Sequence, residues 1–184
     1  ESALIEVIDV RCESGSEFIF DEEKKSWKVD WKNQRHFERV FESRKVEYVV
    51  SLIGWSRNTS QRELLEGSMN LVRACEKEEV GKLILVTQRS QNILKGDKYK
   101  MNISKGSLWG LGRVVRTEMG KKFKCTNVDM ESLDDLVEEI EMKDGTEIGW
   151  RKGVRYMQKL EVEGRNNKNE AGIDVESSLV YILV

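Results

Sequence analysis

The stretch Met101-Asn-Ile-Ser-Lys-Gly-Ser-Leu-Trp-Gly-Leu-Gly-Arg-Val-Val-Arg-Thr-Glu118 carries the strongest structural signal in the chain. Apolar residues recur along it at spacings of three to five, which predicts one helix with an apolar stripe. The stripe consists of Ile103, Leu108, Leu111, Val115 and Met119. Three glycines lie within the same predicted helix, each at a cost of up to about 1 kcal/mol relative to alanine. We therefore expect something to approach the backbone of this helix closely.

The three glycines are Gly106, Gly110 and Gly112, and two further residues stand out beside them. Trp109 and Arg113 are four residues apart, so they lie on one helical face and are placed to stack. The spacing Gly-x-x-x-Gly-x-Gly is that of a dinucleotide-binding turn, but such a turn must directly follow a strand and open a helix. Here the glycines fall inside a predicted helix, far from the nearest strand. We interpret them as a packing surface.

Short apolar and β-branched runs alternate with helical patterns through the rest of the chain. Strands are predicted at residues 4–10, 46–53, 81–87 and 123–129, an edge strand at 27–31, helices at 34–43, 60–77 and 132–142, and a tight-turned pair at 147–150 and 154–160. Thr59 or Ser60 is expected to cap the second helix and Ser132 the acidic one. The pattern predicts a truncated Rossmann-like α/β/α fold in three layers, with a mostly parallel sheet and a C-terminal β-hairpin.

Composition limits the classes of function. The 184 residues include 31 basic and 33 acidic ones in an interspersed pattern, for a net charge of -2. This balance is typical of a soluble surface and does not indicate nucleic-acid binding. No apolar run approaches the roughly 20 residues of a membrane span, and no signal segment is evident. Cys12, Cys75 and Cys125 lack metal-type spacing, so we expect free thiols in a cytoplasmic protein.

Reductase chemistry of the short-chain dehydrogenase type needs a Tyr-x-x-x-Lys pair, in which the phenol donates the proton and the lysine lowers its pKa. Lys105 has the expected position, but Met101 stands where the tyrosine is needed. Tyr99 would point to another side of the helix. Thr87 or Ser90 could serve as the hydroxyl partner, yet without the phenol it has nothing to assist. The sequence thus predicts a dehydrogenase-like helix without its acid.

Other candidates are weaker. His36, the only histidine, is interpreted as a surface residue, because no nucleophile or carboxylate is tied to it by a motif. The acidic groups at 21–23 and 138–139 are interpreted as solvated faces. A carboxylate pair assembled in space for hydrolysis or for a metal stays open at this point.

Several strings together resemble the structural half of a ketoreductase from a modular polyketide synthase. The segment from Leu108 to Glu118 is similar to that family's Leu-Trp-Gly-Leu-Gly-Arg-Val followed by Glu. Val128-Asp129 is like its Val-Asp-Leu, and residues 150–160 are like its Arg-x-Gly-x-Arg-Tyr-Val-x-x-Leu. Val49-Val-Ser-Leu52 and Leu85-Val-Thr-Gln88 fit its intervening strands. The resemblance extends over residues 46–160.

The resemblance implies two subdomains in such a ketoreductase: a truncated, non-catalytic one, and one that binds NADPH and reduces the β-keto group on an acyl carrier protein. This chain would be the truncated, non-catalytic subdomain. It would bind no cofactor itself, and its partners would be the catalytic subdomain of the same polypeptide, the carrier protein and other synthase domains. No catalytic, cofactor-binding or metal-binding residue is assigned. The motif residues, interpreted as structural, are Lys105, Gly106, Trp109, Gly110, Gly112, Arg113, Glu118, Arg151, Gly153, Arg155 and Tyr156.

The expected organisation is a structural subdomain at residues 1–163, a polar linker at 164–178, and at 179–184 the first strand of a following catalytic subdomain. The family has prolines around the key helix, and this chain has none. The subdomain also starts at what resembles its second strand. Two alternatives stay open: an interaction or dimerisation module of a megasynthase, and a divergent short-chain reductase that uses Tyr99 and Lys105.

Overall fold

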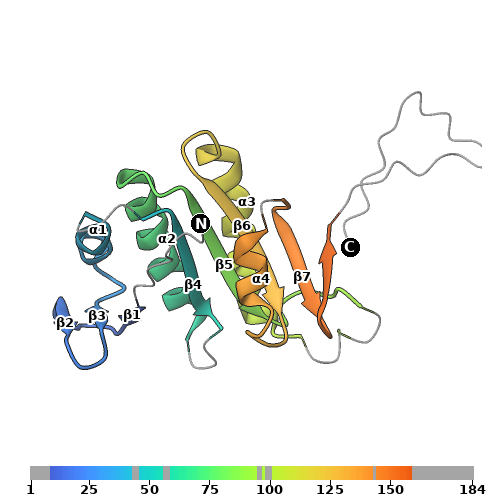
Figure 1. Cartoon of the computed structure of the whole chain (residues 1–184), viewed down its shortest axis with the longest axis horizontal. Helices are drawn as coiled ribbons and strands as arrows, with labels where there is room; N and C mark the ends of the chain where they lie inside the picture. The colour runs from blue at the N-terminus through green and yellow to red at the C-terminus, as the bar shows by residue number, and fades with distance from the viewer. Residues whose placement is uncertain are drawn as a thin grey trace, which may run out of the picture.

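The computed structural model describes residues 9–42, 46–55, 59–94, 97, 101–142 and 144–158. Its largest feature is a five-stranded sheet in the order β4-β5-β6-β7-β8 (Figure 1). The first four strands are parallel, and β8 is antiparallel to β7. The elements are β1 Asp9–Cys12, β2 Ile19–Asp21, β3 Ser26–Val29, α1 Gln34–Glu42, β4 Tyr48–Gly54, α2 Gln61–Lys77, β5 Lys82–Gln88, the 3-10 helix η2 Ile103–Lys105, α3 Ser107–Met119, β6 Lys124–Met130, α4 Leu136–Glu141, β7 Glu147–Arg151 and β8 Val154–Met157.

Helices cover both faces of this sheet, so the molecule has three layers. The alternation of side chains along β5 shows this directly. Leu83 and Leu85 pack into one apolar cluster together with α2 and α3, while Ile84 and Val86 pack into a second cluster against α4. All four side chains are fully buried. The predicted α/β/α architecture with a mostly parallel sheet and a C-terminal hairpin is confirmed.

The connections between the parallel strands do not all have the same hand. From β4 to β7 each strand is added on the same side of the previous one. The helices α2 and α3 lie on one face, however, and α4 lies on the other. The connection through α4 therefore has the opposite hand to the two before it. Because nearly all such crossovers are right-handed, the short α4 connection is an unusual feature of this fold.

The amino-terminal strands form a separate, three-stranded sheet in the order β1-β3-β2. The prediction of an edge strand at 27–31 is wrong, since β3 is the central strand and Val29 is fully buried. Of the strand predicted at 4–10, only Asp9 and Val10 fall within the described residues, where they begin β1, and residues 4–8 lie outside them. Most of β1 is exposed.

Local chemistry accounts for the two best-defined ends of elements. Ser60 caps α2, because its hydroxyl accepts a hydrogen bond from the backbone N–H of Glu63, whose carboxylate accepts one from the backbone N–H of Ser60. Lys152 and Gly153 both have positive φ, 54° and 71°. Positive φ at both central residues is typical of the tight turn that matches strand twist in hairpins. The predicted turn between β7 and β8 is confirmed.

Two predicted helices begin later than expected. The helix predicted from Met101 begins at Ser107, because Asn102 donates its backbone N–H to the carbonyl of Arg89 at 2.7 Å and a 3-10 turn follows. Ile103 is consequently 79% exposed and does not belong to the apolar stripe. The helix predicted from Ser132 begins at Leu136. Ser132 does not cap it, because its hydroxyl forms a local turn with Asp134.

Candidate functional site

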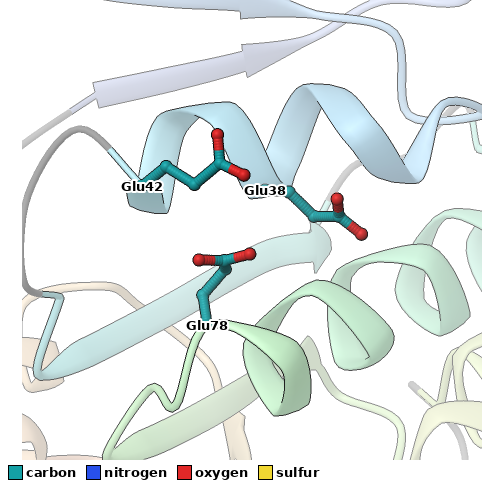
Figure 2. A group of neighbouring side chains, drawn as sticks. All are labelled: Glu38, Glu42 and Glu78. Carbon is teal, nitrogen blue, oxygen red and sulfur yellow. The ribbon is translucent and has the colours of Figure 1, made fainter.

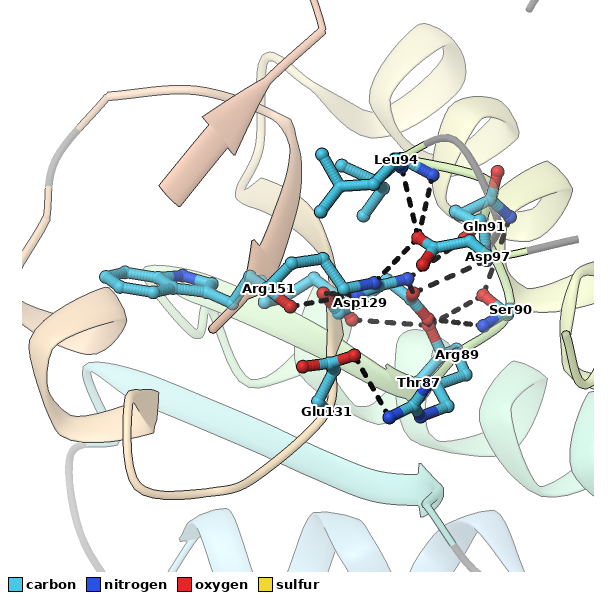
Figure 3. A network of polar contacts seen from close by, with 12 residues as sticks. Thr87, Arg89, Ser90, Gln91, Leu94, Asp97, Asp129, Glu131 and Arg151 are labelled. Atoms are coloured by element: carbon cyan, nitrogen blue, oxygen red, sulfur yellow. Dashed lines mark hydrogen bonds and ion pairs between the residues drawn. The ribbon is translucent and has the colours of Figure 1, made fainter. Parts of the chain in front are cut away.

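The polar side chains of the fold gather at the carboxyl ends of β5, β6 and β7 (Figure 3). In open α/β sheets this edge is where ligands bind. Thr87 lies near the end of β5, Asp129 lies one residue before the end of β6, and Arg151 ends β7. The strands run parallel, which brings three side chains far apart in sequence together. All three are buried, with exposed fractions of 0%, 0% and 1%.

Asp129 is the centre of this network. Its Oδ1 atom accepts hydrogen bonds from the Thr87 hydroxyl and from the Ser90 backbone N–H, both at 2.7 Å. Its Oδ2 atom accepts one from Arg151 at 2.6 Å. A buried carboxylate is costly unless it is both paired and hydrogen-bonded, and Asp129 meets both conditions. The carboxylate of Asp129 in β6 thus links Thr87 of β5 with Arg151 of β7.

Arg151 uses every donor of its guanidinium inside the protein. Nε donates to Asp97 at 2.9 Å, one terminal nitrogen donates to the backbone carbonyls of Asp129 and Trp150, and the other donates to Asp129 Oδ2 and the carbonyl of Gln91. Burial alone would lower the pKa of this group, but the bonds to Asp129 and Asp97 outweigh it and raise the pKa. A guanidinium has five N–H donors. None is left for a phosphate or a substrate.

The hydroxyl of Thr87 is occupied in the same way. It donates to Asp129, it lies 2.8 Å from the Ser90 hydroxyl, and it accepts the indole N–H of Trp109 at 3.1 Å. A hydroxyl has one proton and two lone pairs. Thr87 therefore has no hydrogen-bonding capacity left to assist a reaction. Trp109 points to Thr87 from α3, so it does not stack on Arg113 as the sequence predicted.

Lys105 ends η2 and is 1% exposed. Its Nζ atom donates to the backbone carbonyl of Thr59 at 3.1 Å. Burial lowers the pKa of this amine. Met101 lies four residues earlier and is half-buried, and Tyr99 falls outside the described residues. Lys105 is thus bonded to the backbone of Thr59, the residue before the Ser60 cap of α2.

The glycines of the motif have three different surroundings. A Cβ atom on Gly112 would lie 2.1 Å from Asn127 Oδ1, so this glycine lets α3 approach β6. A Cβ on Gly106 would meet the Ile103 carbonyl oxygen at 3.2 Å. Gly110 differs from the expectation of close packing, because a Cβ there would have nothing within 4 Å. The two helical glycines are two residues apart and so point to different sides of α3.

The remaining motif residues are Arg113 and Glu118 of α3, Gly153 in the turn after β7, and Arg155 and Tyr156 of β8. Arg113 forms a two-pronged ion pair with Glu147 at the start of β7, at 2.7 and 2.9 Å. Arg155 on β8 binds Glu139, a fully buried residue of α4 that also accepts the indole N–H of Trp150. The other three motif residues, Glu118, Gly153 and Tyr156, take no part in the hydrogen-bond network around Asp129. Glu118 and Gly153 are exposed, and Tyr156 is half-buried.

Three carboxylates are close enough to suggest a metal site (Figure 2). Glu38 and Glu42 of α1 and Glu78 after α2 can bring one oxygen each within 4.8 Å of one another. Lys77 and Arg35 already bind Glu38, at 2.6 and 2.8 Å, and lower its pKa to about 2. These two cations supply the positive charge that a metal would otherwise bring, so the cluster is an ion-pair network.

His36 also has a structural contact. Its Nδ1 atom accepts a hydrogen bond from the backbone N–H of Asp30 at 3.0 Å, and its ring lies 5.5 Å from that of Phe18.

The sequence motifs singled out Arg151 and Trp109 but missed Asp97 and Asn127. Neither stands in a motif, and their partners are 54 and 18 residues away.

Comparisons with known proteins found no match among protein-family models and none among curated proteins. Among solved structures, a short-chain dehydrogenase from Burkholderia cenocepacia in complex with NADP is 13% identical, over 77% of this chain and 87% of its own, with a TM-score of 0.49. UDP-glucose 4-epimerase from Thermus thermophilus in complex with NAD is 17% identical, over 55% of this chain and 39% of its own, with a TM-score of 0.42.

A nucleoside-diphosphate-sugar epimerase from Staphylococcus aureus is 18% identical, over 61% of this chain and 39% of its own, with a TM-score of 0.43. The chain thus spans 39% of the length of each of these two epimerases. Because the three TM-scores are below 0.5, the fold assignment rests on the sheet topology instead. Among the described residues, no helix is both long and apolar enough to cross a bilayer.

Proposed function

We propose that this chain is the non-catalytic structural subdomain of a polyketide synthase ketoreductase. It would support an NADPH-dependent subdomain that reduces a β-keto group on an acyl carrier protein. The observation that carries the proposal is the state of the Thr87 hydroxyl, which is fully hydrogen-bonded to Asp129, Ser90 and Trp109. A reductase of this fold type needs a free hydroxyl at that strand end to position its substrate.

The neighbouring residues support the same proposal. A ketone reduction needs a proton donor beside the carbonyl oxygen, and the thioether of Met101 cannot supply one. The amine of Lys105 is directed to the Thr59 carbonyl. The five donors of Arg151 are likewise consumed within the protein. The polar groups at this edge thus stabilise the subdomain, and the chemistry would belong to its neighbour.

A titration of the isolated chain with NADPH, followed by cofactor fluorescence and calorimetry, tests whether the chain binds the cofactor by itself. We expect no saturable binding up to about 1 mM and no turnover of a β-keto thioester. The variant Met101→Tyr restores Tyr-x-x-x-Lys and should be equally inactive, because the hydroxyls of Thr87 and Ser90 stay hydrogen-bonded to each other and Thr87 to Asp129. Micromolar binding with turnover, in either protein, would refute the proposal.

The supporting role needs its own test in a polypeptide that joins this chain to its catalytic subdomain. Gly112→Ala, which forces α3 away from β6, should lower the temperature at which NADPH-dependent reduction is lost. The KM for NADPH should not change, because the substitution does not touch the cofactor. Gly110→Ala lies two residues away in open space and serves as the matched control. Equal thermal inactivation of both variants would count against a supporting role.

One observation favours the interaction module as a second candidate. The outer side of α3 presents Gly110 and Val114, which are four residues apart and so lie on one helical face, and Ile103 of the preceding 3-10 turn η2 is exposed as well. Ile103 is 79% exposed, Val114 is 49% exposed, and Gly110 has open space above it. Sedimentation velocity of the isolated chain, with Val114→Asp as the comparison, tests self-association. A dimer that Val114→Asp dissociates would support the module, and a monomer at all concentrations would exclude dimerisation.

A further inference from the structure

Three polar side chains form a row at the amino ends of the sheet strands, at the opposite end of the strands from the Asp129 network (top of the sheet in Figure 1). Lys82, the first residue of β5, is the register partner of Tyr48 in β4 and of Lys124 in β6. Neighbouring strands lie about 4.8 Å apart, and register partners point to the same face of a sheet. Ile84, two residues along β5, packs into the cluster on the α4 side. This lysine row of Tyr48, Lys82 and Lys124 therefore faces α4.

Lys82 is the unusual member of the row, because the residue is only 8% exposed. Its Nζ atom donates to the backbone carbonyl of Met142, directly after α4, at 3.2 Å. This is its one side-chain hydrogen bond among the described residues. An ammonium group has three donors, so two remain. Lysine is almost never fully buried unless it is paired with an opposite charge, and no described carboxylate forms an ion pair with Lys82.

The acidic groups whose charges act on Lys82 are already bound to another cation. They are Glu139 and Asp144, and Arg155 binds them at 2.7 and 3.3 Å, respectively. Burial lowers the pKa of Lys82, the charge of Glu139 opposes this effect, and the charge of Lys124 adds to it. Lys124 also forms no ion pair with a described residue. Two ammonium groups thus lie on neighbouring strands without a described carboxylate bonded to either.

A cavity of about 350 Å³ is lined by all three members of the lysine row. This volume is at the lower end of the range of small-molecule sites. Three strands contribute hydrogen-bond donors to it, as two ammonium groups and one phenol. The described residues of the lining are Glu47, Tyr48, Gly81, Lys82, Lys124 and Met142. Among them only Glu47 carries a carboxylate, and this residue is exposed.

We propose that the lysine row binds the phosphate group of a small phosphate monoester. A dianion supplies the negative charge that the two neighbouring ammonium groups lack. Lysine binds phosphate as a point charge, and the Tyr48 phenol adds a neutral donor. The carboxylate of Glu47 can accept a hydrogen bond from a hydroxyl of the organic part. The site is independent of the proposed function, because it lies at the other end of the strands from Thr87 and Arg151.

An NMR titration of the 184-residue chain with inorganic phosphate and with glycerol 3-phosphate tests the site. At about 0.15 M ionic strength, both should bind saturably and shift the amide signals of Tyr48, Lys82 and Lys124. The signals of Thr87 and Arg151 should not move. Acetate, which carries one charge, should bind at least about tenfold more weakly. Absence of saturable binding, or equal affinity for acetate and phosphate, would overturn the proposal.

Substitutions separate the site from a general attraction of the surface for anions. Lys124→Met changes an exposed residue, so the fold should persist, and the affinity for inorganic phosphate should fall at least about tenfold. Lys82→Met should cause a similar loss. Lys121→Met removes the same charge from an exposed residue outside the described lining, and it should change the affinity less than about twofold. Glu47→Gln should tighten binding, because it removes a repelling charge. Equal losses in Lys121→Met and Lys124→Met would overturn the site.

Thermal stability gives a second readout. A ligand that binds only the folded chain raises the melting temperature as its concentration increases. Phosphate also stabilises proteins in general, because it is excluded from their surfaces, so the comparison with Lys124→Met is decisive. Inorganic phosphate should raise the melting temperature of the wild type more than that of Lys124→Met, while sodium chloride of equal ionic strength should not distinguish them. An equal gain from phosphate in both proteins would overturn the proposal.

Discussion

The substitution Gly112→Ala tests the central packing contact of α3. A Cβ atom on Gly112 would lie 2.1 Å from Asn127 Oδ1 and 2.6 Å from both its Cγ and Nδ2 atoms. Asn127 is fully buried in β6, and its amide nitrogen donates to the Trp109 carbonyl at 3.1 Å. Its Oδ1 atom has no hydrogen-bond partner among the described residues. The side chain must move when the methyl group is added, and the bond to α3 must then break.

The magnitude follows from three contributions. Overpacking a close-packed interior costs about 1–3 kcal/mol, and a buried amide that loses its partner costs about 1–3 kcal/mol. Replacing glycine by alanine within a helix returns about 1 kcal/mol. We therefore expect the free energy of unfolding to fall by about 1–5 kcal/mol. For a chain of this size the melting temperature should fall by about 2–20 °C.

Gly110→Ala is the matched control. It lies in the same helix, is exposed, and has nothing within 4 Å of the new methyl group. The helix gains alanine without a clash, so unfolding should require about 0.5–1 kcal/mol more. The double variant Gly112→Ala/Asn127→Ala removes both the clash and the stranded amide. It should be more stable than Gly112→Ala alone, with a coupling energy above about 1 kcal/mol.

Urea unfolding followed by circular dichroism and by tryptophan fluorescence measures the wild type and these variants, together with Asn127→Ala. The reasoning is refuted if Gly112→Ala is as stable as the wild type or as Gly110→Ala. It is also refuted if the losses from Gly112→Ala and Asn127→Ala simply add. Either outcome would mean that α3 does not rest on Asn127.

Three further predictions concern charged groups. Arg151→Met strands the Asp129 carboxylate and should cost about 3–5 kcal/mol in urea unfolding; a loss below about 1 kcal/mol would contradict the network. The pKa of Glu38 is lowered from 4.5 to about 2, so it stabilises the fold above pH 4.5 and this stabilisation is lost as the pH falls towards 2. Glu38→Gln should remove about 1–2 kcal/mol of that pH dependence after solvent screening; an unchanged acid profile would refute it. Burial lowers the pKa of Lys105 below 10.5, so its contribution to stability should rise with pH up to about that value. Lys105→Met should reduce the rise without removing it, because burial also lowers the pKa of Lys82; the same rise in both proteins would exclude Lys105 as a source.

The sheet could be predicted from the sequence because its strands carry local runs of apolar and β-branched residues, even where polar residues stand among them, as in β6. The runs at 46–53, 81–87 and 123–129 needed no knowledge of their partners, and the Ser60 cap depends only on Glu63, three residues away. Failures occurred where a distant contact decides. The helix predicted from Met101 starts later because the backbone of Asn102 is bound to that of Arg89, on a loop that carries no periodic signal. The roles of Gly110 and Gly112 depend on which side of α3 meets Asn127, and helical spacing alone does not determine that.

The candidate site shows the same limit more sharply, because residue types do not reveal which of their hydrogen-bonding groups are free. Thr87 and Lys105 are the residue types that the short-chain dehydrogenase reaction uses, and the guanidinium of Arg151 is a type of group that binds phosphate. Thr87 lies near the carboxyl end of β5 and Arg151 at that of β7. The hydrogen-bond partners of Thr87, Lys105 and Arg151 are 42, 46 and 22 residues away, respectively. The sequence therefore identifies these side chains but does not predict whether their polar groups are already hydrogen-bonded. In the fold, the Thr87 hydroxyl and the Arg151 guanidinium have every donor and acceptor occupied, whereas among the described residues the Lys105 amine makes one hydrogen bond, to the Thr59 carbonyl. A group whose hydrogen bonds are all made inside the protein would have to break buried bonds before it could bind a substrate. Each broken bond costs about 1–3 kcal/mol, which favours a structural role for this edge over a catalytic one.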